Sequence, residues 1–555
     1  MPTLSPDMGK TTPSRANAPR WGHVPTDCCA IPLSDKAFVD LLHATTRPYC
    51  VCLDGDETPV ATEVLPGIGD CNGSGFPVVA IGLPCHAAQL GDPTFCRDHG
   101  VKFACYGGAM ANGIASEDLV EALAKESLLG IFGAAGLPLE EVEAAIDRLQ
   151  ASLGDQPFGV NLIHSPNEQA LEMAVADLLI AKGVHLVEAS AYLDLTPAVV
   201  KYRVQGIHED ADGKVVVPNR IIAKISRVEV AEKFLLPPPA RFLDPLVASG
   251  EITAAQVKLA ARIPMADDIT AEADSGGHTD NRPAIALLPT IIALRDRIQV
   301  QHKYPTAPRV GLAGGVSTPA AAAAAYAMGA AYIVTGSVNQ ACVESGSSDI
   351  VRQMLAEACQ ADTAMAPAAD MFEMGVEVQV LKRGTMFSMR GARLFELYRQ
   401  CSSIDDIPAD ERAKLEKQLF RAPLTQIWEE TKTFFQKRDP KQLIRAEKDP
   451  KHKMALIFRS YLGQASLWAN RGDAARKIDF QIWCGPAMGA FNEWVRGTFL
   501  EAPERREVAT VVLNILHGAA VVTRCASLSN QGVTLPASCR QYAPLERSQL
   551  EEYIR

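Results

Sequence analysis

The sequence of 555 residues lacks an excess of basic residues, an uninterrupted apolar run of membrane length and any C-x-x-C pair. The 54 Lys and Arg residues are outnumbered by 65 Asp and Glu residues, giving a net charge of −11, and no extended basic run is present. This balance argues against nucleic acid as the main partner. The longest apolar stretch, residues 320–334, is interrupted by Met328 and Gly329. It therefore favours an alanine-rich helix followed by a buried strand over a membrane span.

The cysteines and the N-terminus both suggest a cytoplasmic protein. Fourteen cysteines are scattered along the chain, eight of them before residue 106, and reduced thiols are the expected state. A zinc site using Cys50, Cys52, Cys71 or Cys85 is the alternative. Residues 1–27 contain no apolar stretch typical of a signal peptide, so a disordered tail is predicted there.

The changes in residue composition and pattern along the chain predict three structured parts. Residues 28–100 carry short β-like runs broken by Gly and Pro and predict a small β-rich domain. Residues 101–385 alternate strand-like and helix-like segments, with a proline-rich insertion at about 235–264 that we expect over the barrel mouth. Residues 386–555 are dominated by charged helices and contain four of the five tryptophans, which we expect to fill a helical core.

The alternation in the middle part predicts a (β/α)₈ barrel, an α/β fold with a closed parallel sheet. An eighth strand is predicted within Gly375–Lys382. The other seven are predicted at Lys102–Tyr106, Phe158–Leu162, His185–Ala189, Ile221–Ser226, Asp268–Ala273, Arg309–Ala313 and Ala331–Thr335.

Two glycine motifs follow late strands of this barrel and together predict a phosphate cradle. The motifs are Ala313-Gly314-Gly315 and Thr335-Gly336-Ser337. Each precedes a predicted helix, so free backbone N–H groups and a helix N-terminus would face a ligand from adjacent strands. Late-strand loops are the usual phosphate position in this fold. Tight turns without a ligand are the alternative.

Lys224 lies inside an otherwise apolar strand, where an ammonium group is costly without a partner. A salt bridge with Glu188 or Glu272 is one interpretation. The other is that Lys224 faces an electron-rich ring, to which Asn161 also presents its amide. With a phosphate cradle on one side, this arrangement would describe a site for flavin mononucleotide (FMN).

A glycine-rich loop with a histidine follows the predicted strand at 268–273. Gly276 and Gly277 allow the backbone to approach a ligand closely, which a Cβ would prevent. His278 directly after them would then lie at the edge of that ligand, where its near-neutral pKa suits proton transfer. A glycine turn carrying a solvated histidine is the alternative.

Three segments together resemble the PfaD family, the trans-acting enoyl reductases of polyunsaturated fatty acid and polyketide synthases. These enzymes share their barrel with nitronate monooxygenases and FabK-type enoyl reductases. The segments are Gly108–Ser116, Glu272–Arg282 and Ile482–Trp494, and the resemblance extends over roughly residues 75–530.

The resemblance implies that FMN binds across the strand ends and that NADPH reduces it. Hydride would then reach the β-carbon of a 2-enoyl thioester on an acyl carrier protein, with His278 orienting the carbonyl or aiding protonation of the α-carbon. The family pattern also implies cofactor contacts from Glu272, Gly276 and Gly277. The segment Ala109, Met110, Ala111 and Asn112 would cover one edge of the flavin.

Two other functions remain open from the sequence. One is FMN-dependent oxidation of nitroalkanes by the same barrel, with oxygen as the oxidant. The other is a non-catalytic barrel that serves as a structural component of a synthase. An acidic carrier would bind a basic patch, for which Arg383, Arg390, Arg393 and Arg399 on a predicted helical face are candidates. A solvated face without a partner is the alternative. A homodimer is one oligomeric state that the sequence leaves open.

Overall fold

The computed structural model describes residues 21–66 and 75–554, and these residues form two compact units. One unit comprises residues 88–516 and 544–546. The other combines the described residues up to 87 with 517–543 and 547–554. The predicted boundaries therefore differ from the observed ones in two places. The β-rich N-terminal part ends earlier than residue 100, and the predicted helical domain at 386–555 is divided between the units.

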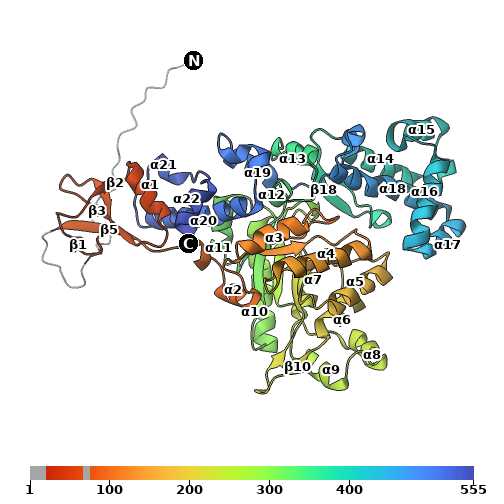
Figure 1. Ribbon diagram of the computed structural model, residues 1–555, viewed down its shortest axis with the longest axis horizontal. Coiled ribbons are helices and arrows are strands. Elements are labelled where there is room, and N and C mark those ends of the chain that lie inside the picture. The colour runs from red at the N-terminus through yellow and green to blue at the C-terminus, as the bar shows by residue number, and fades with distance from the viewer. Residues whose placement is uncertain (1–20, 67–74, 555) are drawn as a thin grey trace, which may run out of the picture. The chain divides into compact units, whose positions relative to one another are not determined.

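Eight parallel strands close into a barrel in the larger unit, which confirms the predicted fold class (Figure 1). Neighbouring strands are in parallel register throughout, for example Asp268 opposite Arg309 and Ile222 opposite Asp268. The strands are β6 (Cys105–Gly107), β7 (Leu129–Phe132), β8 (Gly159–Ile163), β9 (Leu186–Ser190), β12 (Arg220–Ile225), β13 (Asp268–Glu272), β15 (Arg309–Ala313) and β16 (Ile333–Thr335).

Helices follow most of these strands and cover the outside of the barrel (Figure 1). Their starts follow ordinary capping rules: Ser116 caps α3 by accepting from the backbone N–H of Leu119, and Thr318 caps α11 through Ala321. The helices are α3 (Glu117–Lys125), α4 (Leu139–Leu153), α5 (Gln169–Ala181), α6 (Pro197–Val204), α7 (Val228–Leu235), α10 (Ala284–His302) and α11 (Pro319–Ala327).

The prediction of the eighth strand was wrong. Glu377–Leu381 forms β18, which pairs antiparallel with β17 (Thr363–Pro367) and with β14 (Gly277–His278) in a separate sheet. The missing barrel strand is β7, four buried residues that pair with β6 and β8. So short an apolar run carries little periodicity, whereas Val378 and Val380 of β18 alternate as a buried strand does.

The insertion between β12 and β13 forms two short helices, α8 (Ala240–Ala248) and α9 (Ala254–Ala260). Instead of covering the strand ends as expected, α8 packs against α6, and α9 packs against β10 (His208–Glu209). β10 belongs to a hairpin with β11 (Val215–Val216). The insertion therefore extends the outer helix layer of the barrel.

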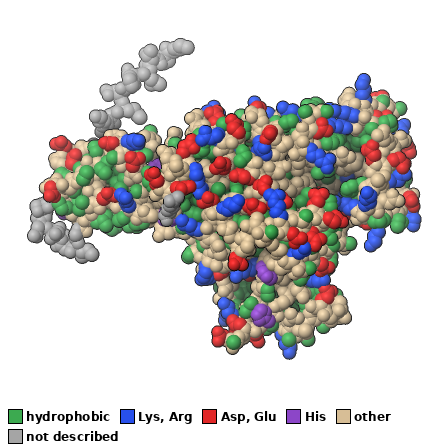
Figure 2. All heavy atoms as spheres, viewed as in Figure 1, with side chains coloured by type: hydrophobic (Ala, Val, Ile, Leu, Met, Phe, Trp, Pro, Cys, Tyr) green, Lys and Arg blue, Asp and Glu red, His purple; other side chains and the backbone are tan. Residues whose placement is uncertain are grey.

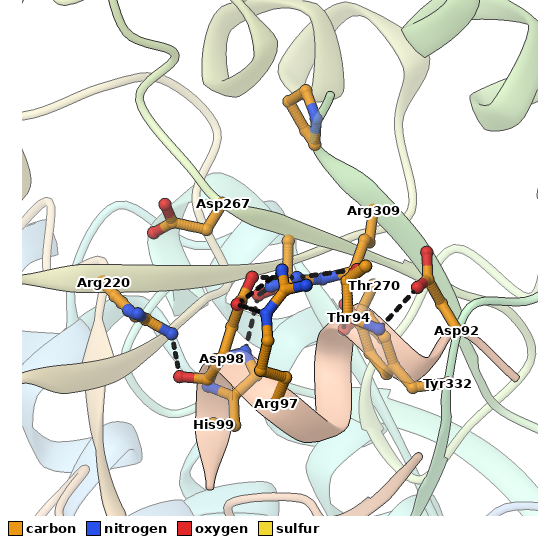
Figure 3. A network of polar contacts seen from close by, with 12 residues as sticks. Asp92, Thr94, Arg97, Asp98, His99, Arg220, Asp267, Thr270, Arg309 and Tyr332 are labelled. Atoms are coloured by element: carbon orange, nitrogen blue, oxygen red, sulfur yellow. Dashed lines mark hydrogen bonds and ion pairs between the residues drawn. The ribbon is translucent and has the colours of Figure 1, made fainter. Parts of the chain in front are cut away.

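A buried ion network lies where β13 and β15 begin, at the opposite end of the strands from their glycine turns (Figure 3). Asp268 accepts from Nε and Nη2 of Arg309 at 2.6 and 3.0 Å, and it lies 2.8 Å from Nε2 of His99 in α2 (Pro93–His99). Arg309 also donates to Asp98 at 2.7 Å. This network ties α2 to the N-terminal ends of the strands, a face that supports stability in barrels of this type.

Residues 387–471 build a helical layer within the same unit. Its core contains Phe372, Leu394, Phe458 and Tyr461. The helix α18 (Pro450–Arg471) packs against α14 (Phe387–Gln400), α16 (Leu424–Arg438) and α17 (Pro440–Lys448). Trp428, Trp468 and Trp483 pack against this core, as expected for most of the tryptophans.

The smaller unit contains a five-stranded antiparallel sheet in the order β1-β5-β3-β4-β2. Its strands are β1 (His23–Val24), β2 (Ile31–Pro32), β3 (Tyr49–Leu53), β4 (Pro59–Thr62) and β5 (Phe76–Gly82). β1 falls inside the predicted tail, whose first twenty residues lie outside the described part of the chain. Cys50 and Cys52 are buried in β3, Cys85 is half-buried, and Cys71 is outside the described residues.

The helix α20 (Val508–Asn530) is long and apolar enough to cross a membrane by length and composition, but 83% of its most apolar window is buried within the protein. That burial is typical of a core helix. Within the smaller unit, Arg524 of this helix donates to the backbone carbonyls of Leu42, Ala44 and Arg47. These bonds attach α20 to the end of α1 (Lys36–His43).

Candidate active site

A pocket lies at the C-terminal ends of the barrel strands, where enzymes of this fold place their chemistry. It encloses about 650 Å³, including the space that is open to solvent. Eleven of the fifteen residues predicted to bind a cofactor line it: Ala109, Met110, Lys224, Glu272, Gly276, Ala313, Gly314, Gly315, Thr335, Gly336 and Ser337. The pocket therefore brings together Lys224 of β12 and the loops after β6, β13, β15 and β16.

The two glycine motifs meet in this pocket from neighbouring strands. Gly314 and Gly315 follow β15 with φ angles of 82° and 81°. A Cβ on Gly314 would lie 2.6 Å from the backbone carbon of Ala273, so only glycine fits there. A Cβ on Gly315 would meet no protein atom within 4 Å. The close approach at Gly314 sets the turn, and Gly315 leaves open space beside its backbone.

The second motif begins a short helix directly. Gly336 precedes α12 (Ser337–Gln340), whose start receives no hydrogen bond from a capping side chain. A Cβ on Gly336 would also meet no protein atom within 4 Å. Uncapped N–H groups beside an open space suit a phosphate group. The side chain of Thr335 is turned inward instead, because its Oγ1 accepts from Nδ2 of Asn339 at 2.9 Å.

Lys224 of β12 lies in the pocket between two carboxylates. Its Nζ is 3.4 Å from Oε1 of Glu188 and 3.3 Å from Oε1 of Glu272. Burial by itself lowers the pKa of Lys224, but the two carboxylates outweigh this effect and raise it above the ordinary value. The salt-bridge interpretation of Lys224 is thus confirmed, and the same ammonium group also lines the pocket. Lys224 remains charged at neutral pH.

The two carboxylates differ in their surroundings. Glu188 is fully buried, and its Oε2 accepts from the backbone N–H of Ala109 at 3.4 Å. Glu272 accepts from the hydroxyl of Ser275 at 3.3 Å. Burial raises the pKa of Glu272, and Lys224 compensates for this only in part. Lys224 is therefore held between two carboxyl groups, of which Glu272 lines the pocket and Glu188 lies beneath its lining.

The loop after β13 is held in place by Gln379 of β18. Nε2 of Gln379 donates to Oδ1 of Asp274 and to the backbone carbonyl of Ser275, both at 2.8 Å. Gly277 and His278 form β14 opposite Gln379 and Val378. Asp274 thus helps to anchor the loop.

His278 pairs with Asp370, which lies between β17 and β18. Nε2 of His278 is 3.4 Å from Oδ1 of Asp370, and the His278 side chain is 29% exposed. Burial by itself lowers the pKa of His278, but the negative charges of Asp370 and Glu272 outweigh it and raise the pKa. The ring therefore retains a proton more readily than an ordinary histidine and can act as a proton donor.

Sequence reasoning missed the contribution of the C-terminal segment to the pocket. Trp483 and Ala487 line it, although they follow the barrel by almost 150 residues. Gly485 packs directly on Gly276, since a Cβ on either residue would lie 2.8 Å from a backbone nitrogen of the other segment. The N–H of Gly485 also donates to Oγ of Ser337 at 3.2 Å. The glycines in Cys484–Gly489 were the available signal.

Five predicted residues do not line the pocket: Ala111, Asn112, Asn161, Gly277 and His278. The side-chain amide of Asn161 donates to the carbonyl of Glu188 at 3.1 Å and to Oγ of Ser190 at 2.8 Å, which joins β8 to β9. The amide of Asn112 donates to Ser466 of α18 at 3.0 Å. Their expected roles toward a cofactor stay predictions.

Comparison with known proteins places this site in a family. Residues 98–396 match the family model of nitronate monooxygenase. Residues 401–480 match a second model, the helical domain inserted in [acyl-carrier-protein] S-malonyltransferase. The first match spans the whole barrel and most of α14, so it includes every lining residue of the pocket except Trp483 and Ala487.

Two curated relatives and one crystal structure are similar to the chain over most of its length. One of the subunits of the polyunsaturated fatty acid synthase of Thraustochytrium is 52% identical over 454 residues, which cover 80% of this chain and 30% of that protein. The polyketide biosynthesis protein PksE of Bacillus subtilis is 44% identical over 437 residues, which cover 79% of this chain and 57% of that protein. The chain thus spans only part of each relative.

The crystal structure is that of the enoyl reductase domain of MlnA, from the macrolactin biosynthesis cluster of Bacillus amyloliquefaciens. It aligns with a TM-score of 0.76 at 39% identity, covering 80% of this chain and 99% of that domain. Together with the family model over the barrel, this similarity decides the assignment. The chain belongs to the nitronate monooxygenase family, in its PfaD-like branch.

Proposed function

We propose that the chain is an FMN-dependent enoyl reductase that uses NADPH to saturate the 2,3-double bond of an enoyl thioester carried on an acyl carrier protein. The observation that carries this proposal is the convergence of Gly315, Gly336 and Lys224 in one pocket at the strand ends. The similarity to the MlnA enoyl reductase domain over 99% of its length supports the reaction class.

The residues present fit FMN. Its phosphate group would be held by backbone N–H groups at Gly315, Gly336 and Ser337, where a Cβ at either glycine would meet no protein atom. Lys224 would place a positive charge beside the ring system, which favours an electron-rich form of it. Bound FMN would supply the hydride chemistry, as a cofactor does in enzymes of this kind.

The protein's own part in the reaction would be to position the thioester and to supply a proton. His278 holds a proton on its ring because Asp370 favours the charged form. We propose that His278 donates a hydrogen bond to the thioester carbonyl or a proton to the α-carbon once the β-carbon has received hydride. Positioned acids of this kind typically contribute about 10²–10⁴ in rate.

The relatives support one class of partner. Two of them are a component of a polyunsaturated fatty acid synthase and a polyketide biosynthesis protein, and residues 401–480 match a domain of a transferase that acts on acyl carrier protein. We therefore propose that the substrate arrives on an acyl carrier protein of such a synthase. A cytoplasmic location would agree with this partner.

Oxidation of nitroalkanes is the second candidate, and the description of the matched family favours it. The two reactions are separated by their substrates. The purified protein would be supplied with FMN and NADPH and given a crotonyl thioester, and the product would be identified by mass spectrometry. Formation of the butyryl thioester supports the reductase. Oxygen consumption with a nitronate, without any reduction of the thioester, would support nitroalkane oxidation and contradict enoyl reduction.

A further inference from the structure

The helices α16 and α17 carry a concentration of positive charge that contrasts with the acidic chain as a whole. Residues 437–453 contain seven Lys and Arg residues and three Asp and Glu residues, while the chain has a net charge of −11. Figure 2 shows Lys and Arg side chains, with some acidic ones among them, at the end of the view where Figure 1 places α16 and α17. The charge in this segment therefore reaches the surface.

One face of α17 combines cations with an apolar side chain. Lys441, Ile444, Arg445 and Lys448 are spaced by three and four residues, which places them on one side of the helix. All four are exposed, and Ile444 is 57% exposed. The opposite side carries Ala446, which packs into a hydrophobic cluster with Phe435 and Leu456. The exposed stripe is therefore not needed for the core.

The acidic residues of the segment are mostly occupied in the fold. Asp439 caps α17 by accepting from the backbone N–H of Lys441, and Asp449 caps α18 in the same way. Within the described residues, no carboxylate lies within 4.0 Å of the ammonium groups of Lys441 and Lys448. Glu447 is the exposed acid at the edge of the stripe.

The end of α16 continues this surface. Phe434 is 52% exposed, and the guanidinium of Arg438 lies 5.6 Å from the centre of its ring. Lys437 is exposed beside them. Exposed apolar side chains beside cations are the complement of an acidic protein surface that has an apolar centre.

Contacts connect this surface to the candidate active site. Arg438 makes two hydrogen bonds to Glu168, at 2.6 and 3.0 Å. The adjacent Asn167 donates from its side chain to the backbone carbonyl of Asp370 at 2.7 Å, and the carboxylate of Asp370 pairs with His278. The end of α16 is therefore linked to His278 through Glu168, Asn167 and Asp370.

We propose that this surface, formed by Phe434, Lys437, Lys441, Ile444, Arg445 and Lys448, is the docking site for the acyl carrier protein. The inference rests on the proposed function and adds the place on the protein where the carrier would bind. It is an alternative to the arginines suggested by the sequence, of which Arg383, Arg390 and Arg393 are paired with Asp362, Asp479 and Glu411. The carrier would contribute acidic side chains to the stripe and an apolar side chain to Ile444.

The test measures binding and does not depend on catalysis. A fluorescently labelled, phosphopantetheinylated acyl carrier protein domain from a polyunsaturated fatty acid synthase is titrated with the full-length protein. The variant reverses three charges, Lys441→Glu, Arg445→Glu and Lys448→Glu. The control reverses three exposed charges elsewhere: Lys214→Glu, Lys258→Glu and Lys417→Glu.

We expect the triple reversal to raise the Kd at least tenfold, and the control to stay within about twofold of the unmodified protein. Wild-type affinity should fall as salt is added, because the contact is exposed. Ile444→Ser should weaken binding without changing the salt dependence. Equal affinity of the reversal variant and its control would overturn the proposal, as would equally tight binding of polyglutamate.

The same proteins separate this proposal from the proposed function. If the protein binds the carrier in the expected way but reduces no enoyl thioester, the result supports the docking site and contradicts the proposed reductase function. Conversely, the reversal variant should reduce a free crotonyl N-acetylcysteamine thioester at the wild-type rate while losing at least tenfold in kcat/KM toward the carrier-bound substrate. Equal losses on both substrates would contradict the docking site.

Discussion

Nε2 of His278 lies 3.4 Å from Oδ1 of Asp370, so a residue at the end of the β13 loop is paired with one that follows β17. The pairing is mutual: the pKa of His278 is raised, and that of Asp370 is lowered although burial alone would raise it. Both residues lie outside the pocket lining but on elements that border it. Asp370 thus favours the protonated form of the proposed proton donor.

The first prediction follows from this pair. Asp370→Asn should lower the pKa of His278, because the favourable charge is lost while the burial remains. The fall in kcat/KM at alkaline pH should then begin at lower pH than in the wild type. A pH profile of thioester reduction, together with an NMR titration of the ring, measures the shift. Asp370→Glu keeps the charge and should restore part of the profile, whereas an unchanged profile in Asp370→Asn would contradict the account.

The same pair affects stability in a defined direction. Because the pKa of His278 is raised in the folded state, the ion pair adds fully to the free energy of unfolding below the pKa that histidine has in the unfolded chain. This stabilisation is lost as the pH rises through the pKa of His278 in the folded protein. The depressed pKa of Asp370 ends the contribution at acid pH. The free energy of unfolding lost in Asp370→Asn should therefore be larger at pH 6 than at pH 9.

A second prediction concerns the phosphate cradle. Gly315→Ala adds a methyl group beside the pocket at a φ of +81°, and Gly183→Ala adds one at a φ of +65° after α5, also in open space. Both should cost about 1–2 kcal/mol of stability from the left-handed backbone. Only Gly315→Ala should weaken FMN binding, which fluorescence quenching on titration with FMN measures. Equal FMN affinity of the two variants would argue against a phosphate at this turn.

The third prediction addresses the buried cation. Lys224→Met leaves Glu188 and Glu272 without their counter-charge and should lower the free energy of unfolding by about 3–5 kcal/mol. The double variant Lys224→Met/Glu188→Gln should recover part of this loss, because one buried charge is removed. Urea unfolding of the cofactor-free proteins measures both. If the cation is also needed beside the flavin, the double variant should stay inactive despite its recovered stability.

The fourth prediction concerns the network at the other end of the barrel (Figure 3). Burial alone would raise the pKa of Asp268, but His99 and Arg309 outweigh it and lower the pKa to about 2. The group therefore stabilises the fold above the unfolded pKa of aspartate, about 4, and this contribution is lost as pH falls toward 2. Asp268→Asn should be strongly destabilised at pH 7, with a smaller deficit at pH 3, in urea unfolding. An equal deficit at both values would contradict the assignment.

The sequence sufficed for the features that depend on local pattern. Seven of the eight barrel strands were located, with β15 predicted at its observed bounds, because buried parallel strands are apolar runs followed by glycine or small polar residues. The cradle glycines were found for the same reason. Lys224 was conspicuous because an ammonium group in a buried strand requires a partner.

What the sequence could not supply depends on tertiary contacts. Glu377–Leu381 has the pattern of a buried strand, and only its pairing with β14 and β17 excludes it from the barrel. Trp483 reaches the pocket because Gly485 packs on Gly276, a contact between residues more than 200 positions apart. The basic face of α17 is flanked in sequence by Asp439 and Asp449, acids that the fold uses as helix caps.

The anaerobic spectrum of the FMN-loaded protein tests the central claim most directly. We expect NADPH to bleach the flavin absorbance, and a crotonyl thioester added afterwards to restore it without oxygen. His278→Ala should retain the flavin and lose most of the restoration. A protein that does not take up FMN, or whose bleached absorbance returns only with oxygen and never with the thioester, would contradict the assignment as an enoyl reductase.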